Sequence, residues 1–292
     1  MWYNEIEEDG MKTIFDYDIK DYSSFKIGGI CRVAYFPEKD SDFLEILNKE
    51  DNPLIIGNMT NILFTDGHFN RAVIILNKNF SNAFVEDGSI IAEAGMTMPA
   101  LSRFAYKNEI GGLEFMEGIP GSIGGGVIMN AGAYGTEFKD IVDEVKVLRY
   151  GKILWVDNAE CEFSSRHSIF QNNKDIVLAA RFKGEKKDAA AIKRDMDDFH
   201  ERRISKQPID YPSCGSVFKR PKDNYASKLI DDLGLKGRSV GGAEVSTKHA
   251  GFIINKGNAT FKDVLDLIEI VKSEVKSKTG IELEPELRII EE

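Results

Sequence analysis

The sequence predicts an α+β protein with two domains, and three observations lead to that prediction. Strand-like runs alternate with helical segments along the chain, and no internal repeat is present. The chain has 292 residues, which is longer than one typical domain, and 42% of them are hydrophobic, which is enough to form a substantial core. A single segment, 111–135, holds nine of the 26 glycines, so backbone without side chains is concentrated in one place.

Strands are predicted where short runs rich in β-branched and aromatic residues lie between turn signals. In chain order these runs are residues 31–37, 53–56, 71–76, 89–94, 144–150, 152–156, 175–182, 251–255 and 286–290. Gly151 separates two alternating runs and predicts a hairpin. The loop Gly57–Asn61 directly follows a buried strand, which is typical of phosphate-contacting backbone, although a plain strand-to-turn junction fits equally well.

Helices are predicted from their caps and from the spacing of their apolar residues. In chain order they cover residues 40–48, 97–107, 186–203, 225–233 and 260–279. We expect Asp40 and Ser41 to cap the first helix, and Thr97, with Pro99 two residues later, to start the second. The helix over 186–203 is highly charged, and we interpret it as a solvated connector between the two domains.

The glycine-rich segment 111–135 is the strongest sign of a ligand. Glycine costs roughly 0.5–1 kcal/mol relative to alanine inside a helix or strand, so this density indicates positive-φ turns or a ligand against the main chain. No charged side chain lies between Glu117 and Gly135. The segment is therefore predicted to bind an anionic cofactor through its N–H groups, with a series of tight turns as the alternative.

Composition excludes several kinds of partner. The net charge is −10, with 48 acidic and 38 basic residues, which disfavours broad binding to nucleic acid or to an anionic membrane. The first ten residues are acidic and no apolar run exceeds five residues, so we expect neither a signal peptide nor a membrane span. Cys31, Cys161 and Cys214 are widely separated, and neither they nor the four histidines have metal-ligand spacing. We expect a reducing compartment and no metal.

Several motifs, in the same order from about residue 24 to residue 290, resemble those of one enzyme family. They lie at residues 57–61 (GNMTN), 118–135 (GIPGSIGGGVIMNAGAYG), 214–219 (CGSVFK), 241–255 and 283–288 (LEPELR). The chain resembles the UDP-N-acetylenolpyruvoylglucosamine reductases, also called UDP-N-acetylmuramate dehydrogenases (the MurB family). No long insertion follows Phe170, which resembles the shorter type of the family that lacks the tyrosine-bearing lid loop.

The resemblance implies an FAD-binding region of the vanillyl-alcohol-oxidase (PCMH) type over residues 1–195, with subdomains of about 1–78 and 79–195. It implies an α+β substrate-binding domain over 196–292, whose last strand, about 286–290, carries a catalytic glutamate back to the flavin site. FAD is expected to bind non-covalently, with its pyrophosphate on the bare backbone. The implied cofactor-binding residues are Gly57, Asn58, Met59, Thr60, Asn61, Gly118, Ile119, Pro120, Gly121, Ser122, Gly124, Gly125, Asn130, Ala131 and Gly132.

The resemblance also implies a reaction. Family enzymes transfer a hydride from NADPH to FAD and then to the enolpyruvyl group of UDP-N-acetylglucosamine enolpyruvate, in cytoplasmic peptidoglycan precursor synthesis. Hydride addition to an enol ether places negative charge on the adjacent carbon and its carboxylate, so the site needs a charge stabiliser and a proton donor. By motif match, Ser216 donates the proton, and Arg166 and Glu286 stabilise the enediolate. The implied substrate-binding residues are Lys219, Arg220, Tyr134 and Lys248. No obligate protein partner is implied.

Two positions depart from the family pattern. Ser165 stands where the family usually has a tyrosine before the catalytic arginine, so an aromatic wall or a hydroxyl toward the substrate phosphates is missing or supplied elsewhere. Arg220 stands where the family has an asparagine, and its guanidinium is able to pair with a diphosphate or to point into solvent.

Other interpretations of the same residues remain open. Without the resemblance, Ser216 is a turn hydroxyl, Arg166 a surface cation and Glu286 a solvated strand residue. Residues 237–241 match the serine hydrolase pattern G-x-S-x-G, but neither the preceding strand nor the following helix of a nucleophile elbow is predicted. Another FAD-dependent oxidoreductase on the same scaffold, with His68 as a covalent flavin link, and a UDP-sugar-binding protein without catalysis are the two alternatives.

Overall fold

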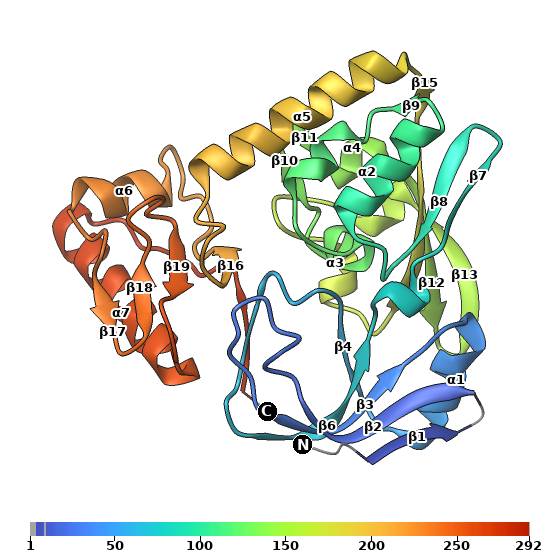
Figure 1. Ribbon diagram of the computed structural model, residues 1–292, viewed down its shortest axis with the longest axis horizontal. Coiled ribbons are helices and arrows are strands. Elements are labelled where there is room, and N and C mark those ends of the chain that lie inside the picture. The colour runs from blue at the N-terminus through green and yellow to red at the C-terminus, as the bar shows by residue number, and fades with distance from the viewer. Residues whose placement is uncertain (1–3, 9, 292) are drawn as a thin grey trace. The chain divides into compact units, whose positions relative to one another are not determined.

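The computed structural model describes residues 4–8 and 10–291 and divides into two compact units (Figure 1). Residues 1–3 and 9 of the acidic N-terminal stretch lie outside the described residues. The first unit comprises residues 1–15, 33–58 and 71–203, and the second comprises residues 16–32, 59–70 and 204–292. The predicted domains, 1–195 and 196–292, place the early segments 16–32 and 59–70 in the first domain, whereas the structure places them in the second unit. Those segments belong to the second unit because Phe25, Ile27 and Leu63 are part of its hydrophobic core.

One five-stranded sheet has the strand order β1-β2-β3-β6-β4. Its strands are β1 (Asn4–Glu8), β2 (Met11–Asp18), β3 (Ile30–Phe36), β6 (His68–Ile75) and β4 (Leu54–Ile56). Strands β4 and β6 are parallel, which requires the crossover between them. Helix α1 (Asp40–Lys49) packs Phe43 against Phe80, with ring centroids 5.1 Å apart. Its N-cap is Lys39, and Asp40 and Ser41 lie inside the helix, so the predicted caps were wrong by one or two residues.

The first unit also contains a second, antiparallel five-stranded sheet with the order β13-β12-β14-β8-β7. Its strands are β7 (Ala83–Glu86), β8 (Ser89–Glu93), β12 (Val142–Arg149), β13 (Lys152–Asp157) and β14 (Ile176–Phe182). The predicted hairpin at Gly151 is confirmed. This unit's helices are α2 (Met98–Lys107), α3 (Ile123–Ile128), α4 (Phe138–Ile141) and α5 (Ala189–Lys206), whose last residues pass into the second unit.

Short elements complete the first unit. Two strand pairs are present, β9 (Ile110–Gly111) with β15 (Glu185–Lys186) and β10 (Gly132–Ala133) with β11 (Thr136–Glu137). The 3₁₀ helices are η1 (Lys78–Phe80), η2 (Glu114–Gly118), η3 (Asn158–Cys161) and η4 (Ile169–Gln171). Thr97 caps α2 as predicted, because its side chain accepts a hydrogen bond from the Ala100 N–H.

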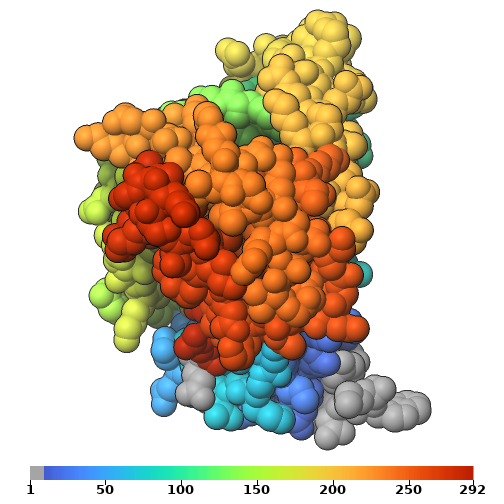
Figure 2. All heavy atoms as spheres, turned by 90° about the vertical axis from the view of Figure 1, so that its left-hand side faces the viewer, coloured from blue at the N-terminus to red at the C-terminus, as the bar shows by residue number. Residues whose placement is uncertain are grey.

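The second unit contains a four-stranded antiparallel sheet with the order β16-β19-β18-β17. Its strands are β16 (Ser213–Ser216), β17 (Ser239–Val240), β18 (Ala243–Val245) and β19 (Phe252–Asn255). Helix α6 (Ala226–Asp232) and helix α7 (Phe261–Thr279) contribute to the same core. In the space-filling view, the C-terminal third of the chain, coloured orange to red, forms one continuous body (Figure 2).

Helix α7 confirms the clearest helical pattern of the sequence. Thr260 and Asp263 form a capping box, and Gly280 ends the helix with a φ of 73°. The remaining strand pair of this unit joins β5 (Ile62–Phe64) in parallel to β20 (Arg288–Ile290), so residues 288–290 lie beside residues 62–64. Among the described residues no helix is both long and apolar enough to cross a membrane.

Candidate active site

In the first unit, the polar loop after β4 meets the start of the glycine-rich helix α3. A Cβ built on Gly57 would lie 2.0 Å from the Ser122 Oγ, so no larger residue fits there without a shift. Within the part of the chain that the structure describes, the N–H groups of Gly57, Asn58, Gly121 and Ser122 meet no acceptor. These are uncharged donors at two touching turns, which is the arrangement that an anionic group needs.

The N–H groups of α3 itself are already used. Ile123 donates to the Met96 carbonyl at 2.8 Å, Gly124 donates to the Ala94 carbonyl at 2.9 Å, and the Ser122 Oγ accepts from the Gly125 N–H at 3.3 Å. Helix α3 is therefore held against neighbouring backbone by its first turn. Available donors precede the helix rather than lie in it.

Close packing explains more of the glycine cluster than turn conformation does. Only Gly112 and Gly135 within 111–135 have positive φ among the nine glycines. A Cβ on Gly118 would lie 2.7 Å from the Tyr134 ring, and one on Gly126 would lie 2.4 Å from the Phe138 ring. Gly125 is exposed, and an added Cβ there would meet only the Ser122 Oγ, at 3.4 Å. Bare backbone that faces open space is thus limited to a small part of the segment.

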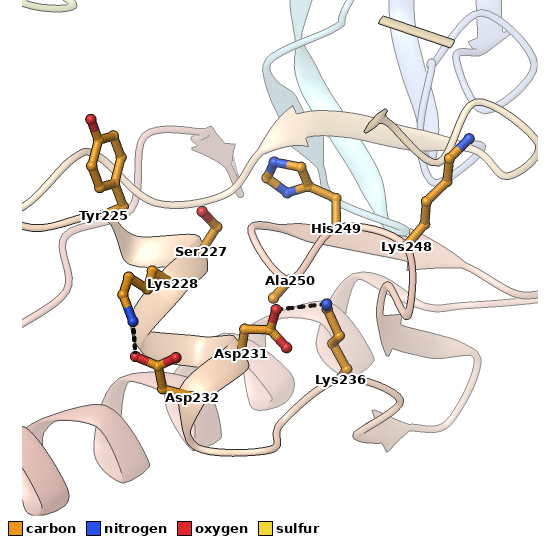
Figure 3. Close-up of a pocket in the computed structure, with 9 residues that line it drawn as sticks. All are labelled: Tyr225, Ser227, Lys228, Asp231, Asp232, Lys236, Lys248, His249 and Ala250. Carbon is orange, nitrogen blue, oxygen red and sulfur yellow. Dashed lines mark hydrogen bonds and ion pairs between the residues drawn. The ribbon is translucent and has the colours of Figure 1, made fainter. Parts of the chain in front are cut away.

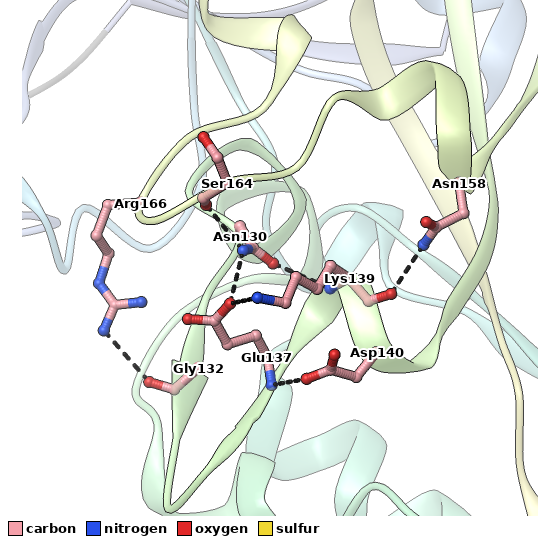
Figure 4. A network of polar contacts seen from close by, with 8 residues as sticks. All are labelled: Asn130, Gly132, Glu137, Lys139, Asp140, Asn158, Ser164 and Arg166. Carbon is pink, nitrogen blue, oxygen red and sulfur yellow. Dashed lines mark hydrogen bonds and ion pairs between the residues drawn. The ribbon is translucent and has the colours of Figure 1, made fainter.

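Arg166 lies at the tip of a two-residue turn in the first unit. Ser164 and His167 exchange backbone hydrogen bonds of 3.0 and 3.2 Å, which leaves Ser165 and Arg166 between them. Arg166 has a φ of 57°, in the left-handed region that non-glycine residues rarely occupy. Its guanidinium Nη2 donates to the Gly132 carbonyl oxygen at 3.5 Å. Figure 4 marks this contact with a dashed line. A strained residue with a directed cation is a feature found at functional sites.

The buried side chain of Asn130 forms a hydrogen bond that holds this turn. Its side chain is fully buried and donates to the Ser164 carbonyl at 2.9 Å and to the Glu137 Oε2 at 3.1 Å (Figure 4). Its Oδ1 accepts the Lys139 N–H at 2.9 Å. The resemblance implies that Asn130 binds the cofactor, whereas in the structure three of the four hydrogen-bonding positions of its side chain are used inside the protein.

In the second unit, Ser216 lies at the end of the edge strand β16. Its side chain is exposed, whereas its neighbours Cys214 and Val217 are buried. Burial raises the pKa of the Cys214 thiol to about 12, so this cysteine is inert beside the exposed hydroxyl. Gly215, with a φ of 81°, turns the chain immediately before Ser216.

Glu286 lies next to Ser216 in the same unit. The Glu286 N–H donates to the Val217 carbonyl at 2.7 Å, and Phe218 and Pro285 form an isolated antiparallel bridge. The backbone segments that carry two of the three predicted catalytic residues are therefore adjacent, although 70 positions separate the two residues in the sequence. The loop residue Asn61 also reaches this place, since its Nδ2 donates to the Glu286 carbonyl at 3.3 Å.

The predicted substrate-binding residues have varied surroundings. The Lys219 Nζ forms an ion pair with Glu284. The Arg220 guanidinium lies 4.0 Å from the centroid of the Tyr225 ring, a cation–π contact. In the first unit, Tyr134 stacks on Phe199 with ring centroids 4.5 Å apart.

Lys248 lines a pocket of about 340 Å³ in the second unit (Figure 3). The residues around it are Tyr225, Ser227, Lys228, Asp231, Asp232, Lys236, Lys248, His249 and Ala250. The Lys228 and Lys236 ammonium groups are paired with Asp232 and Asp231, whereas the Lys248 Nζ donates to the Ile204 carbonyl at 2.6 Å. Burial lowers the pKa of His249, whose Nδ1 accepts the Gly251 N–H, so the imidazole is neutral at pH 7.

The rival hydrolase motif has no suitable structure. Ser239 lies on the two-residue strand β17, and β18 follows after a tight turn instead of a helix. A nucleophile elbow requires a strand-to-helix turn. Among the described residues no group of three or more His, Cys, Asp or Glu side chains has a metal-binding arrangement.

Known families and proteins match both parts of the chain. Residues 37–157 match the family described as "FAD binding domain", and residues 207–290 match "UDP-N-acetylenolpyruvoylglucosamine reductase, C-terminal domain". The protein named UDP-N-acetylenolpyruvoylglucosamine reductase in Caldanaerobacter subterraneus subsp. tengcongensis is 46% identical, over 99% of this chain and 96% of its own. The protein of that name in Geobacillus kaustophilus is 45% identical, over 95% and 92%.

A solved structure agrees with these matches. The crystal structure of UDP-N-acetylenolpyruvylglucosamine reductase (MurB) from Thermus caldophilus has a TM-score of 0.82 and 31% sequence identity, and covers 96% of this chain and 99% of that chain. The matches to an FAD-binding domain and to a reductase C-terminal domain define an FAD-dependent oxidoreductase. More specifically, the chain belongs to the family of UDP-N-acetylenolpyruvoylglucosamine reductases.

Proposed function

We propose that this protein reduces the enolpyruvyl group of UDP-N-acetylglucosamine enolpyruvate to UDP-N-acetylmuramate with NADPH, in cytoplasmic synthesis of peptidoglycan precursors. Family membership over nearly the whole chain supports the reaction. The observation that carries the proposal in the structure is the adjacency of Ser216 and Glu286, because the motif match gives these residues the proton donor and the enediolate stabiliser. We assign cofactor binding mainly to residues 1–195 and substrate binding mainly to residues 196–292.

The residues present fit FAD at the loop after β4. Gly57, Asn58, Gly121 and Ser122 offer N–H groups to a pyrophosphate, and a Cβ at Gly57 would close the space against Ser122. When bound, FAD accepts a hydride from NADPH and donates it to the enolpyruvyl double bond. The protein's own task is to hold the flavin and the substrate in one orientation and to manage charge and proton.

Three side chains have separate roles in that task. The Arg166 guanidinium neutralises charge that develops on the substrate carboxylate, and Glu286 holds the enediolate by hydrogen bonding or as an acid. The exposed Ser216 hydroxyl donates its proton to the carbon next to that carboxylate. A hydroxyl is a weak acid, but a carbanion is a strong base, so correct positioning matters more here than the pKa of the donor.

The test of the function is NADPH oxidation that depends on the UDP-enolpyruvyl sugar. Purified protein is expected to be yellow, and NADPH consumption should require the sugar and yield UDP-N-acetylmuramate. Flavin that is reduced by NADPH but reoxidised only by oxygen would favour another oxidoreductase on this scaffold. Protein that binds the UDP-sugar without any turnover would favour the non-catalytic alternative.

Arg220 gives a prediction about substrate affinity. We expect Arg220→Ala to weaken UDP binding about tenfold, because one charge-assisted contact contributes roughly 1.5–3 kcal/mol and part of that is offset by solvation. Isothermal titration with UDP measures the effect. Arg220→Lys retains the charge but loses the flat contact with Tyr225, and should give an intermediate Kd. An unchanged Kd in both variants would show that Arg220 does not contribute to UDP binding.

A further inference from the structure

Asn61 is the last residue of the predicted cofactor-binding loop, residues 57–61. It connects this loop by hydrogen bonds to the segment that carries Glu286. The Asn61 carbonyl accepts the Arg288 N–H at 2.9 Å, and the Asn61 Nδ2 donates to the Glu286 carbonyl at 3.3 Å. Immediately beyond it, Ile62 pairs with Arg288 in the parallel ladder of β5 and β20. Asn61 therefore forms hydrogen bonds with the backbone on both sides of Leu287, at Glu286 and at Arg288.

The side chain of Asn61 takes over a ladder hydrogen bond that the main chain would otherwise make. In a parallel ladder, the residue opposite Leu287 donates its own N–H to the carbonyl of residue 286 and accepts from the N–H of residue 288. Here the carboxamide supplies the first of these bonds. Within the described residues the main-chain N–H groups of Thr60 and Asn61 meet no acceptor, so they are available to a ligand.

The same short stretch is also fixed beside Ser216. A Cβ on Gly215 would lie 3.6 Å from the Thr60 carbonyl oxygen, and the Glu286 N–H donates to the Val217 carbonyl at 2.7 Å. On the other side, the Ser24 hydroxyl donates to the Met59 carbonyl at 2.6 Å. The side chain and the carbonyl of Asn61 thus connect the predicted cofactor-binding loop to the segment that carries Glu286. The Glu286 N–H in turn connects that segment to Val217, the residue after Ser216.

We propose that Asn61 is a positioning residue whose side chain holds Glu286 in place, while the main chain of its loop serves the cofactor. The proposal rests on the proposed function, and it changes the expectation for this residue. A side chain that bound the cofactor would control FAD affinity. A side chain that positions Glu286 controls the substrate half-reaction, because only that half-reaction develops charge on the substrate.

The experiment separates the two half-reactions by stopped-flow absorbance in Asn61→Ala and Asn61→Asp. Both variants lose the donor, and the aspartate also directs an oxygen at the Glu286 carbonyl. We expect reoxidation of reduced enzyme by the UDP-enolpyruvyl sugar to slow about 10–100-fold, since small misplacements near reacting groups have effects of that order. Flavin reduction by NADPH and the Kd for FAD, measured by titrating flavin-free protein, should both stay within about threefold.

Ser24→Ala is the matched control, because it removes a hydrogen bond from the same loop without touching Glu286. With flavin saturating, its reoxidation rate should stay within about threefold of that of the unmodified protein. Weaker FAD binding in both Asn61 variants with normal reoxidation at saturating flavin would overturn the proposal and make the side chain a cofactor ligand. Equal slowing of both half-reactions, or no change in either, would also overturn it. Unmodified protein that the sugar fails to reoxidise would instead refute the proposed function.

Discussion

Replacing Ser216 by alanine should slow reoxidation of the reduced flavin by the UDP-enolpyruvyl sugar at least a hundredfold and leave reduction by NADPH nearly intact. Removal of a proton-transfer group typically costs about 10²–10⁴ in rate. The hydroxyl is exposed at the end of the edge strand β16, where only the oxygen would be lost. Neither Cys214, which is buried, nor Val217 offers a replacement proton donor.

Stopped-flow traces of each half-reaction measure the effect, and two further variants make it specific. Ser213→Ala, at the other end of the same strand, should behave like the unmodified protein. Ser216→Cys retains a proton on a group with a lower ordinary pKa and should recover part of the rate. Equal loss of both half-reactions in Ser216→Ala would contradict the role of proton donor and indicate a disturbed flavin site.

Elements that local chemistry determines could be predicted from the sequence. Thr260 and Gly280 bound α7 because a capping box and a left-handed glycine act within a few residues. The hairpin at Gly151 has the same local origin. Helix α3 was not predicted, since three consecutive glycines are poor helix formers. It forms because Ile123 and Gly124 donate to backbone carbonyls outside the helix.

The pairing of segments that lie far apart in the chain could not be predicted from the sequence. Residues 62–64 pair with 288–290, and the segments 16–32 and 59–70 belong with the C-terminal third, which no periodicity indicates. The identities of the predicted catalytic residues came from motif resemblance, and the adjacency of Ser216 and Glu286 came from the structure. Residues that hold the predicted catalytic residues in place could not be recognised from the sequence.

Gln171 illustrates this kind of supporting residue. Its Nε2 donates to the Arg166 carbonyl and to the Ile128 carbonyl, each at 2.9 Å. One amide side chain thereby links the turn that carries Arg166, residues 164–167, to the end of helix α3. A glutamine in a polar stretch is ordinarily solvated, so neither its type nor its position suggested this contact.

Arg166→Ala should produce the second large effect, a loss of about 10²–10³ in the rate of flavin reoxidation by the substrate. Removal of one preorganised group that stabilises transition-state charge costs about that much. The fold should tolerate the change, because alanine and arginine have the same Cβ constraint at a φ of 57°. Asn130 and Gln171 hold the turn through the Ser164 and Arg166 carbonyls, which the substitution leaves in place.

Comparison with Arg166→Lys then separates charge from geometry. Lysine keeps the positive charge as a single point but lacks the planar fork that meets both oxygens of a carboxylate. If charge alone matters, the lysine variant should regain most of the rate, whereas a requirement for bidentate contact should leave it close to the alanine variant. Arg194→Ala, which removes an exposed cation from α5 of the same unit, controls for the general loss of charge. Normal reoxidation in Arg166→Ala would remove the arginine from the mechanism and leave Ser216 and Glu286 to act without it.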